Sequence, residues 1–230
     1  MTLKTIATGS TGNAFILTDD NGKHLLIEAG LPMPEIKKGL DYDVENLQGA
    51  IITHGHNDHS LSVNKLRDMG VKTYTPYFDT EHKRMRTSIG DFVIDSFPVP
   101  HNGVENRGFI ITVDGQKICF LIDLEYCPYD LSKQGINVLI CECNYISELV
   151  PDDIPNLRHK VIGHASLDTT IGIIKNCKKN LRKVILTHMS KGETFNKEKA
   201  MDKIIAEIPP YIDVEFAKAD TVIDISDCPF

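Results

Sequence analysis

Residues 49–59 read Gly-Ala-Ile-Ile-Thr-His-Gly-His-Asn-Asp-His, and this stretch decides the fold. Its first half, residues 49–53, is a mostly apolar run, as expected of a strand that is buried on both faces. Side chains two positions apart do not face one another on a helix, so the second half is expected to be a loop at the strand's end. Imidazole and carboxylate groups bind zinc and its first-row neighbours, so the loop predicts a metal site. Its candidate ligands are His54, His56, Asp58 and His59.

Further candidate ligands stand where other apolar stretches end. They are His101 after SFPVP, Asp123 within FLIDLE and His188 at the end of VILTH. Polar residues at strand ends are where α/β folds build their sites. We therefore expect these three side chains to meet the histidine loop in space.

The composition is that of an ordinary folded chain. Its 230 residues are 41% hydrophobic and 25% charged, which excludes a disordered protein. The formal net charge of −7 disfavours a general affinity for nucleic-acid phosphates, although a metal site attracts phosphates locally. No apolar run approaches the roughly 18 residues that cross a bilayer, and residues 1–13 lack the apolar core of a secretion signal. We expect a cytoplasmic protein with no membrane partner, one domain over residues 1–230, and buried free cysteines.

Hydrophobic periodicity predicts an α/β protein with many strands and a few inserted helices. The expected helices span residues 34–40, 60–69, 169–180 and 196–208. The expected strands span residues 3–8, 14–18, 24–28, 49–53, 71–75, 91–99, 108–113, 117–124, 136–143, 183–187, 211–217 and 221–225. Residues 82–86, HKRMR, are interpreted as a solvated basic face, with contact to a nucleic-acid backbone as the alternative.

In order and spacing, these motifs resemble the metallo-β-lactamase superfamily, from Ile6 to the C-terminal strands. The resemblance implies an αββα sandwich, two mixed β-sheets flanked by helices, with a di-metal site at one edge. Two ions about 3.5–4 Å apart can share a hydroxide and stabilise both oxygens of a displacement, which is hydrolytic chemistry. Zinc is the expected divalent metal, with manganese or iron as alternatives. The family pattern implies that His54, His56 and His101 bind one ion, that Asp58, His59 and His188 bind the other, and that Asp123 bridges both.

Further motifs resemble the YycJ/WalJ group of small nuclease-like phosphodiesterases. Residues 7–17, ATGSTGNAFIL, are similar to that group's opening, and residues 140–145 and 163–166 resemble segments of relatives that cut RNA and DNA. The resemblance implies that His164 contacts the scissile phosphate, and Glu142 is expected to hold its imidazole in one tautomer. The candidate catalytic residues are thus Asp58, Glu142 and His164. The candidate substrate-binding residues are Ser10, Asn13, His164 and Ser166, although turn chemistry explains Asn13 at least as well.

Two features depart from the family pattern. Glu28 stands where relatives usually have an aspartate that supports the histidine loop. Only 64 residues lie between Asp123 and His188, which leaves no room for the large lid domain that RNA-processing relatives insert there. We therefore expect an open site, or one covered by short loops or a partner subunit, and a homodimer is left open.

The leading hypothesis is a di-metal phosphodiesterase that acts on nucleic acid like a DNA exonuclease. A metal-bound hydroxide would attack phosphorus in line, and His164 would assist the phosphate or the leaving group. Three alternatives stay open: a phosphodiesterase of cyclic or other small nucleotides, a thioester or lactone hydrolase, and a non-catalytic metal-binding regulator. A purely structural metal site is normally closed, which counts against the regulator.

Overall fold

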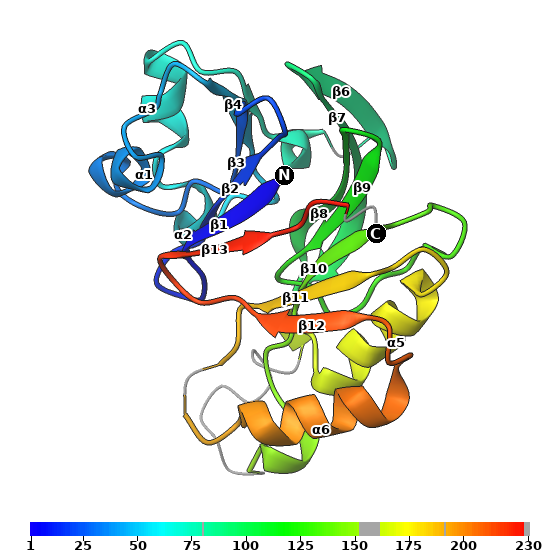
Figure 1. Ribbon diagram of the computed structural model, residues 1–230. Helices are drawn as coiled ribbons and strands as arrows, with labels where there is room; N and C mark the ends of the chain where they lie inside the picture. The colour runs from blue at the N-terminus through cyan, green and yellow to red at the C-terminus, as the bar shows by residue number, and fades with distance from the viewer. Residues whose placement is uncertain (80, 152–161, 191, 228–230) are drawn as a thin grey trace.

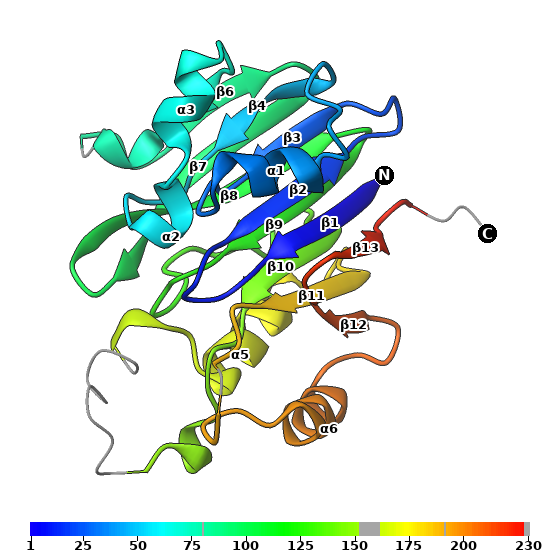
Figure 2. The same cartoon turned by 90° about the vertical axis from the view of Figure 1, so that its left-hand side faces the viewer.

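The computed structural model describes residues 1–79, 81–151, 162–190 and 192–227. Two β-sheets lie face to face and carry helices on their outer faces, so the layers run helix, sheet, sheet, helix (Figures 1 and 2). This arrangement confirms the αββα sandwich predicted from the sequence. Among the described residues, none of the helices combines the length and apolar character that crossing a membrane requires.

The first sheet has six strands in the order β13-β1-β2-β3-β4-β5. Strands β13, β1, β2 and β3 are antiparallel to their neighbours, whereas β3, β4 and β5 run parallel. In that order the strands span Thr221–Asp224, Thr2–Ala7, Ala14–Thr18, His24–Ile27, Leu47–Ile51 and Thr73–Tyr74. The outer face is covered by α1 (Met33–Gly39), α2 (Asn57–Ser60) and α3 (Val63–Asp68).

The second sheet has seven strands in the order β12-β11-β10-β9-β8-β7-β6. Strands β9 to β12 run parallel, and β6 to β9 form an antiparallel meander. In that order the strands span Asp213–Phe216, Lys183–Thr187, Val138–Glu142, Gln116–Leu121, Val104–Val113, Phe92–His101 and Met85–Ile89. Its outer face is covered by α5 (Leu167–Cys177) and α6 (Lys197–Glu207), and two short 3₁₀ turns are η1 (Pro76–Phe78) and η2 (Ser147–Leu149).

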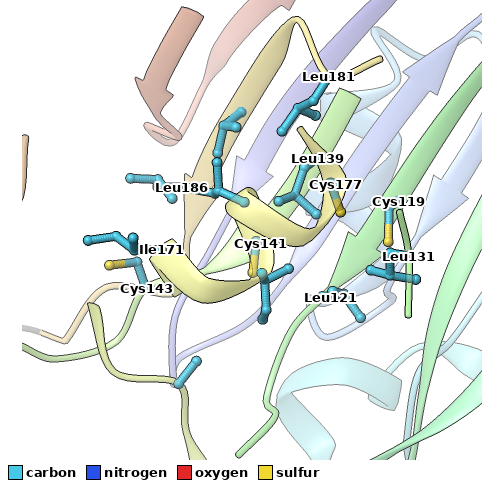
Figure 3. Packing of buried hydrophobic residues seen from close by; sticks show 14 of the residues in the cluster. Cys119, Leu121, Leu131, Leu139, Cys141, Cys143, Ile171, Cys177, Leu181 and Leu186 are labelled. Atoms are coloured by element: carbon cyan, nitrogen blue, oxygen red, sulfur yellow. The ribbon is translucent and has the colours of Figure 1, made fainter. Parts of the chain in front are cut away.

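Three apolar clusters bind these layers together. The central one lies between the sheets, where the rings of Phe15 and Phe120 meet edge to face with centroids 5.5 Å apart. Burying such side chains supplies the main driving force for the sandwich. The cluster beneath α5 contains buried cysteines among leucine and isoleucine side chains (Figure 3). Five described cysteines are free, four of them buried, as predicted: Cys119, Cys127, Cys141, Cys143 and Cys177. Cys228 lies outside the described residues.

The structure differs from the expected elements at several places. The helix expected over residues 60–69 begins only at Val63, as α3, because the chain turns at Ser62, whose hydroxyl donates to the Leu31 carbonyl at 2.6 Å. The stretch before it was expected to be a loop, but it contains the short helix α2, in which Asp58 and His59 lie. Strand β6 was not predicted, since its sequence overlaps the basic cluster of residues 82–86. Its alternating burial and its pairing with β7 make it an edge strand of the second sheet.

Candidate active site

Three neighbouring parallel strands bring polar residues to one edge of the second sheet. Asp123 follows β9, Glu142 is the last residue of β10, and His188 directly follows β11. Strand β10 pairs with both neighbours, so the carboxyl ends of all three meet at the same edge. The tertiary structure thus brings together residues that are 65 positions apart.

The histidine loop reaches the same edge from the first sheet. His54 and His56 follow β4, and Asp58 and His59 lie in the short helix α2. His101 ends β7 of the second sheet. Both sheets therefore contribute to one site. The sequence predicted that polar residues at the ends of apolar strands would meet the histidine loop, and they do.

The first group of side chains consists of three histidines and one carboxylate. Nε2 of His54 lies 2.9 Å from Nδ1 of His56 and 3.6 Å from Oδ2 of Asp123. Nε2 of His101 lies 3.8 Å from the same carboxylate oxygen. All four ligand atoms lie within 4.8 Å of one another. Nitrogen lone pairs that converge so closely on a carboxylate form a donor set suited to a divalent ion.

The second group shares Asp123 with the first. Nε2 of His59 lies 3.1 Å from Oδ2 of Asp123 and 3.5 Å from Oδ2 of Asp58. Nδ1 of His188 lies 3.1 Å from Oδ1 of Asp123. The ligand atoms of these four residues also lie within 4.8 Å of one another. Asp123 is therefore the residue common to both groups.

Unpartnered buried atoms support the fit of these residues to metal ions. Among the described residues, Oδ1 of Asp123 and Nε2 of His188 are buried and make no hydrogen bond. An unpartnered buried polar atom is costly, and a cation beside it would remove that cost. Burial lowers the pKa of His101. Burial and the neighbouring His59 lower the pKa of His54, so both rings are neutral and each offers a lone pair. Burial favours a neutral Asp123, but His188 and His59 outweigh it and hold the pKa of Asp123 well below its usual range.

Glu142 organises two histidines at once. Its Oε1 accepts from Nδ1 of His164 at 2.6 Å and from Nδ1 of His188 at 2.9 Å. Its Oε2 accepts from the backbone N–H groups of Leu124 and Ala165. Since Nδ1 of His188 carries the donated proton, its Nε2 is left with the lone pair that a metal needs. The buried carboxylate thus selects one tautomer for a candidate ligand and also orients His164.

The backbone is strained at three of these positions. Glu28, Asp123 and His188 have φ values of 67°, 51° and 52°, in the left-handed region that side chains other than glycine rarely adopt. Such conformations cost free energy and persist where the surrounding structure requires them, which is most often at functional sites. All three lie next to strand ends at the same edge.

Glu28 and Asn13 support the histidine loop from behind. Glu28 is fully buried, accepts from the backbone N–H of Thr53 at 3.2 Å, and places Oε2 3.4 Å from Nδ1 of His59. Burial raises the pKa of Glu28, against the opposing charge of His59. Nδ2 of Asn13 lies 3.1 Å from Nε2 of His59 and 3.3 Å from the carbonyl of Asp58. The longer glutamate thus occupies the supporting position, and Asn13, predicted to bind substrate, is buried against the loop.

Gly30 allows the loop to approach the first sheet. A Cβ on Gly30 would lie 1.7 Å from the carbonyl oxygen of Asp58. We expect Gly30→Ala to lower the free energy of unfolding by about 3 kcal/mol or more and to reduce the bound metal, because backbone on both sides cannot yield to a methyl group. Denaturant unfolding and elemental analysis measure the two effects.

Gly172→Ala is the matched control for that experiment. It lies within α5, where a Cβ would meet nothing within 4 Å, and alanine there should stabilise the helix by up to about 1 kcal/mol. A Gly30→Ala protein with unchanged stability and metal content would contradict the close-packing argument.

The ligand groups open into a pocket of about 230 Å³. Ser10, Gly163 and His164 line it, as do Asn102 and Val104, which the sequence did not indicate. Ser166 instead caps α5, because its Oγ accepts from the backbone N–H of Thr169 at 3.1 Å.

Asn144 is a supporting residue that sequence reasoning missed. Its Nδ2 donates to the carbonyl of His188 at 2.9 Å and so holds the strained turn after β11. The available signal was its position two residues past Glu142, at the same strand end.

Comparisons with known proteins agree with this geometry. The model of the metallo-beta-lactamase superfamily matches residues 7–74, which include the histidine loop. The exodeoxyribonuclease WalJ of Streptococcus pneumoniae is 26% identical to this chain, and the alignment covers 95% of this chain and 93% of WalJ. The exodeoxyribonuclease YycJ of Bacillus anthracis is 25% identical, and the alignment covers 63% of each chain. The crystal structure of YhfI from Bacillus subtilis, a metallo-beta-lactamase fold protein, superposes with a TM-score of 0.76 at 18% identity over 97% of this chain and 99% of that one. With a similar sandwich and a family model that matches its histidine loop, the chain is similar to the metallo-β-lactamase superfamily.

Proposed function

We propose that this chain is a hydrolase that uses two divalent metal ions to cleave phosphodiester bonds in nucleic acid, as a DNA exonuclease. The observation that carries the proposal is the pocket in which Asp123 joins the two ligand groups, while His164 lies beside them in a third cluster with Asp123, Glu142 and His188. The two relatives named above are both exodeoxyribonucleases, which supports the same substrate class.

The metal-holding residues follow from the two groups. His54, His56 and His101 would hold one ion, and Asp58, His59 and His188 the other, with Asp123 shared. Such a histidine-rich set suits zinc, with manganese and iron as alternatives. When bound, the ions would polarise the phosphoryl oxygens and lower the pKa of the attacking water.

His164 is the proposed proton donor. Burial lowers its pKa, but the Glu142 carboxylate outweighs burial and raises the pKa of His164 to about 9, so the ring is protonated at neutral pH. Its Nδ1–H is engaged by Glu142, which leaves the Nε2–H for a phosphoryl or leaving-group oxygen. Asp58 also lines the pocket, and its carboxylate is positioned to accept a hydrogen bond from the attacking water.

A second candidate substrate is a small phosphodiester, such as a cyclic nucleotide. The pocket beside the ligand groups is small, at about 230 Å³, and the net charge of −7 weakens general attraction to long polyanions. The chemistry and the roles of His164 and Asp123 would be the same.

Product analysis by mass spectrometry distinguishes the candidates. Protein of defined metal content is incubated with linear duplex DNA, single-stranded DNA, RNA and cyclic nucleotides, with Asp58→Ala as the control variant. We expect mononucleotides from DNA, reduced about 10³-fold or more in the control because a metal ligand in the reacting pocket is lost. Products from cyclic nucleotides alone would favour the second candidate. If no phosphodiester is cleaved by protein that holds two ions, the proposal is wrong, and thioesters and lactones are the next substrates to test.

A further inference from the structure

We propose that a groove running from the metal-ligand groups along β7 to Arg84 binds a single polynucleotide strand, with Tyr126 stacking on a base and Arg84 contacting a phosphate. The inference rests on the proposed phosphodiesterase function and names the form of substrate that the site takes. The groove lies outside the ligand groups, and its binding residues come from the segment after β9 and from the segment before β6.

Three cavities follow one another along this path. The active-site pocket shares His101 and Val104 with a groove of about 330 Å³ between the β7–β8 hairpin and residues 126–129. That groove shares Tyr129 with a third hollow of about 230 Å³, which Arg84 lines. Because each cavity shares wall residues with the next, a chain of nucleotides can leave the reacting centre along this line.

Tyr126 presents an aromatic ring close to the reacting centre. Its side chain is 54% exposed, which is unusual for a large apolar ring, and it lines the middle cavity with Pro128. The preceding residue anchors it, because the Glu125 N–H donates to the Pro100 carbonyl at 2.8 Å and its carboxylate accepts from the Asn102 N–H at 2.7 Å. An exposed ring on an anchored segment is a stacking platform for an unpaired base.

Arg84 supplies a fixed positive charge farther along. Its guanidinium carbon lies 5.1 Å from the centroid of the Tyr129 ring, which in turn packs edge to face on Phe97 with centroids 5.3 Å apart. The buried Arg107 donates to the backbone carbonyls of Asp79 and His82 and so holds the segment that leads to Arg84. Stacking on Tyr129 leaves the edges of the Arg84 guanidinium free for a phosphate.

The charge distribution in the groove indicates that Arg84, and not Arg86, contacts the phosphate. Arg86 makes two short hydrogen bonds to Asp95, at 2.6 and 2.7 Å, so its charge is balanced. Within the described part of the chain, Arg84 forms no ion pair with a carboxylate. Glu105 lines the middle cavity and opposes a polyanion. A strand that binds here must therefore gain from Arg84 and from stacking, which requires an unpaired base and favours single strands over duplex.

Fluorescence anisotropy with labelled phosphorothioate oligothymidylates, which resist cleavage, tests this path on the metal-loaded protein. We expect Arg84→Ala and Tyr126→Ala each to weaken binding of a 12-mer about 10-fold, while a dinucleotide loses little because it does not reach Arg84. Arg84→Ala should also make the slope of log K against log salt shallower by about 0.7, whereas Tyr126→Ala should leave the slope unchanged. Glu105→Gln should tighten binding, and Tyr126→Phe should retain it.

Lys38→Ala is the matched control, because it removes one exposed positive charge from α1 on the other sheet. Oligouridylates of the same lengths show whether the strand is DNA or RNA. The inference is wrong if Arg84→Ala and Tyr126→Ala bind the 12-mer as tightly as the unchanged protein does. If the phosphodiester substrates are cleaved all the same, the proposed function stands without the groove. If the variants weaken binding while the metal-loaded protein cleaves no phosphodiester, the groove stands and the proposed function fails.

Discussion

Replacing Asp123 by asparagine is expected to lower the rate of phosphodiester hydrolysis by about 10⁴-fold or more, the largest effect of any single substitution in the site. Asp123 supplies one carboxylate to both ligand groups, at 3.1 Å from His59 and from His188 and at 3.6 Å from His54. An amide carries no charge and offers a single oxygen where the carboxylate offers two, so it could not serve both ligand groups. Loss of an ion takes away several kcal/mol of transition-state stabilisation, which is the basis of the magnitude.

Metal analysis separates this explanation from misfolding. We expect Asp123→Asn to keep the circular dichroism spectrum of the unchanged protein while it binds fewer equivalents of zinc or manganese. Asp130→Asn makes the same chemical change at an exposed position on the same segment, where the carboxylate accepts from the Ser132 N–H, and should retain both metal and rate. Full metal occupancy with full activity in Asp123→Asn would show that the carboxylate is not a shared ligand.

Replacing His164 by alanine is expected to lower kcat by about 10²–10⁴-fold and to leave the metal content unchanged. The ring lines the pocket and belongs to neither of the two proposed ligand groups, although it forms a third cluster with Asp123, Glu142 and His188. Its loss still leaves Glu142 bonded to Nδ1 of His188 at 2.9 Å, so the tautomer of that ligand is kept. The proton that His164 would give to the phosphate or the leaving oxygen is what disappears.

The measurement compares kcat, KM and bound metal in the same preparations. His82→Ala is a suitable control, because this exposed histidine contacts Asp79 and does not line the pocket. We expect the decrease for His164→Ala to fall mainly on kcat, since a proton donor acts in the transition state. A variant that loses metal together with rate would make His164 a structural support of the ligands, and an unchanged rate would remove it from the mechanism.

The residue pattern predicted an α/β chain whose candidate ligands follow apolar strands, and the family resemblance of its motifs implied the sandwich. Apolar strands that end in His54, Asp123 and His188 place ligand-bearing residues at sheet edges by local periodicity alone. Parallel strands with their carboxyl ends aligned then have to bring these residues together. The free, buried cysteines followed in the same way from apolar context.

Other elements could not be predicted because local and tertiary preferences disagree there. Residues 60–69 have helical periodicity, but the chain turns at Ser62, which bonds to Leu31, and the helix begins only at Val63. The basic cluster of residues 82–86 overlaps β6 and hid this edge strand from prediction, since one face of the strand meets solvent and carries no apolar signal. The local composition favours a solvated loop, but hydrogen bonding to β7 makes these residues a strand.

The sequence by itself determined which residues could bind metal, where strands end, and which family the chain resembles, because these depend on residue type and short-range spacing. Only the tertiary structure decided that Gly30 must lack a side chain beside Asp58, that Asn13 supports His59, and that Arg84 and Tyr126 lie along one groove. These contacts join segments that are far apart in the sequence. Their distances are set by the packing of two sheets, and no local pattern encodes them.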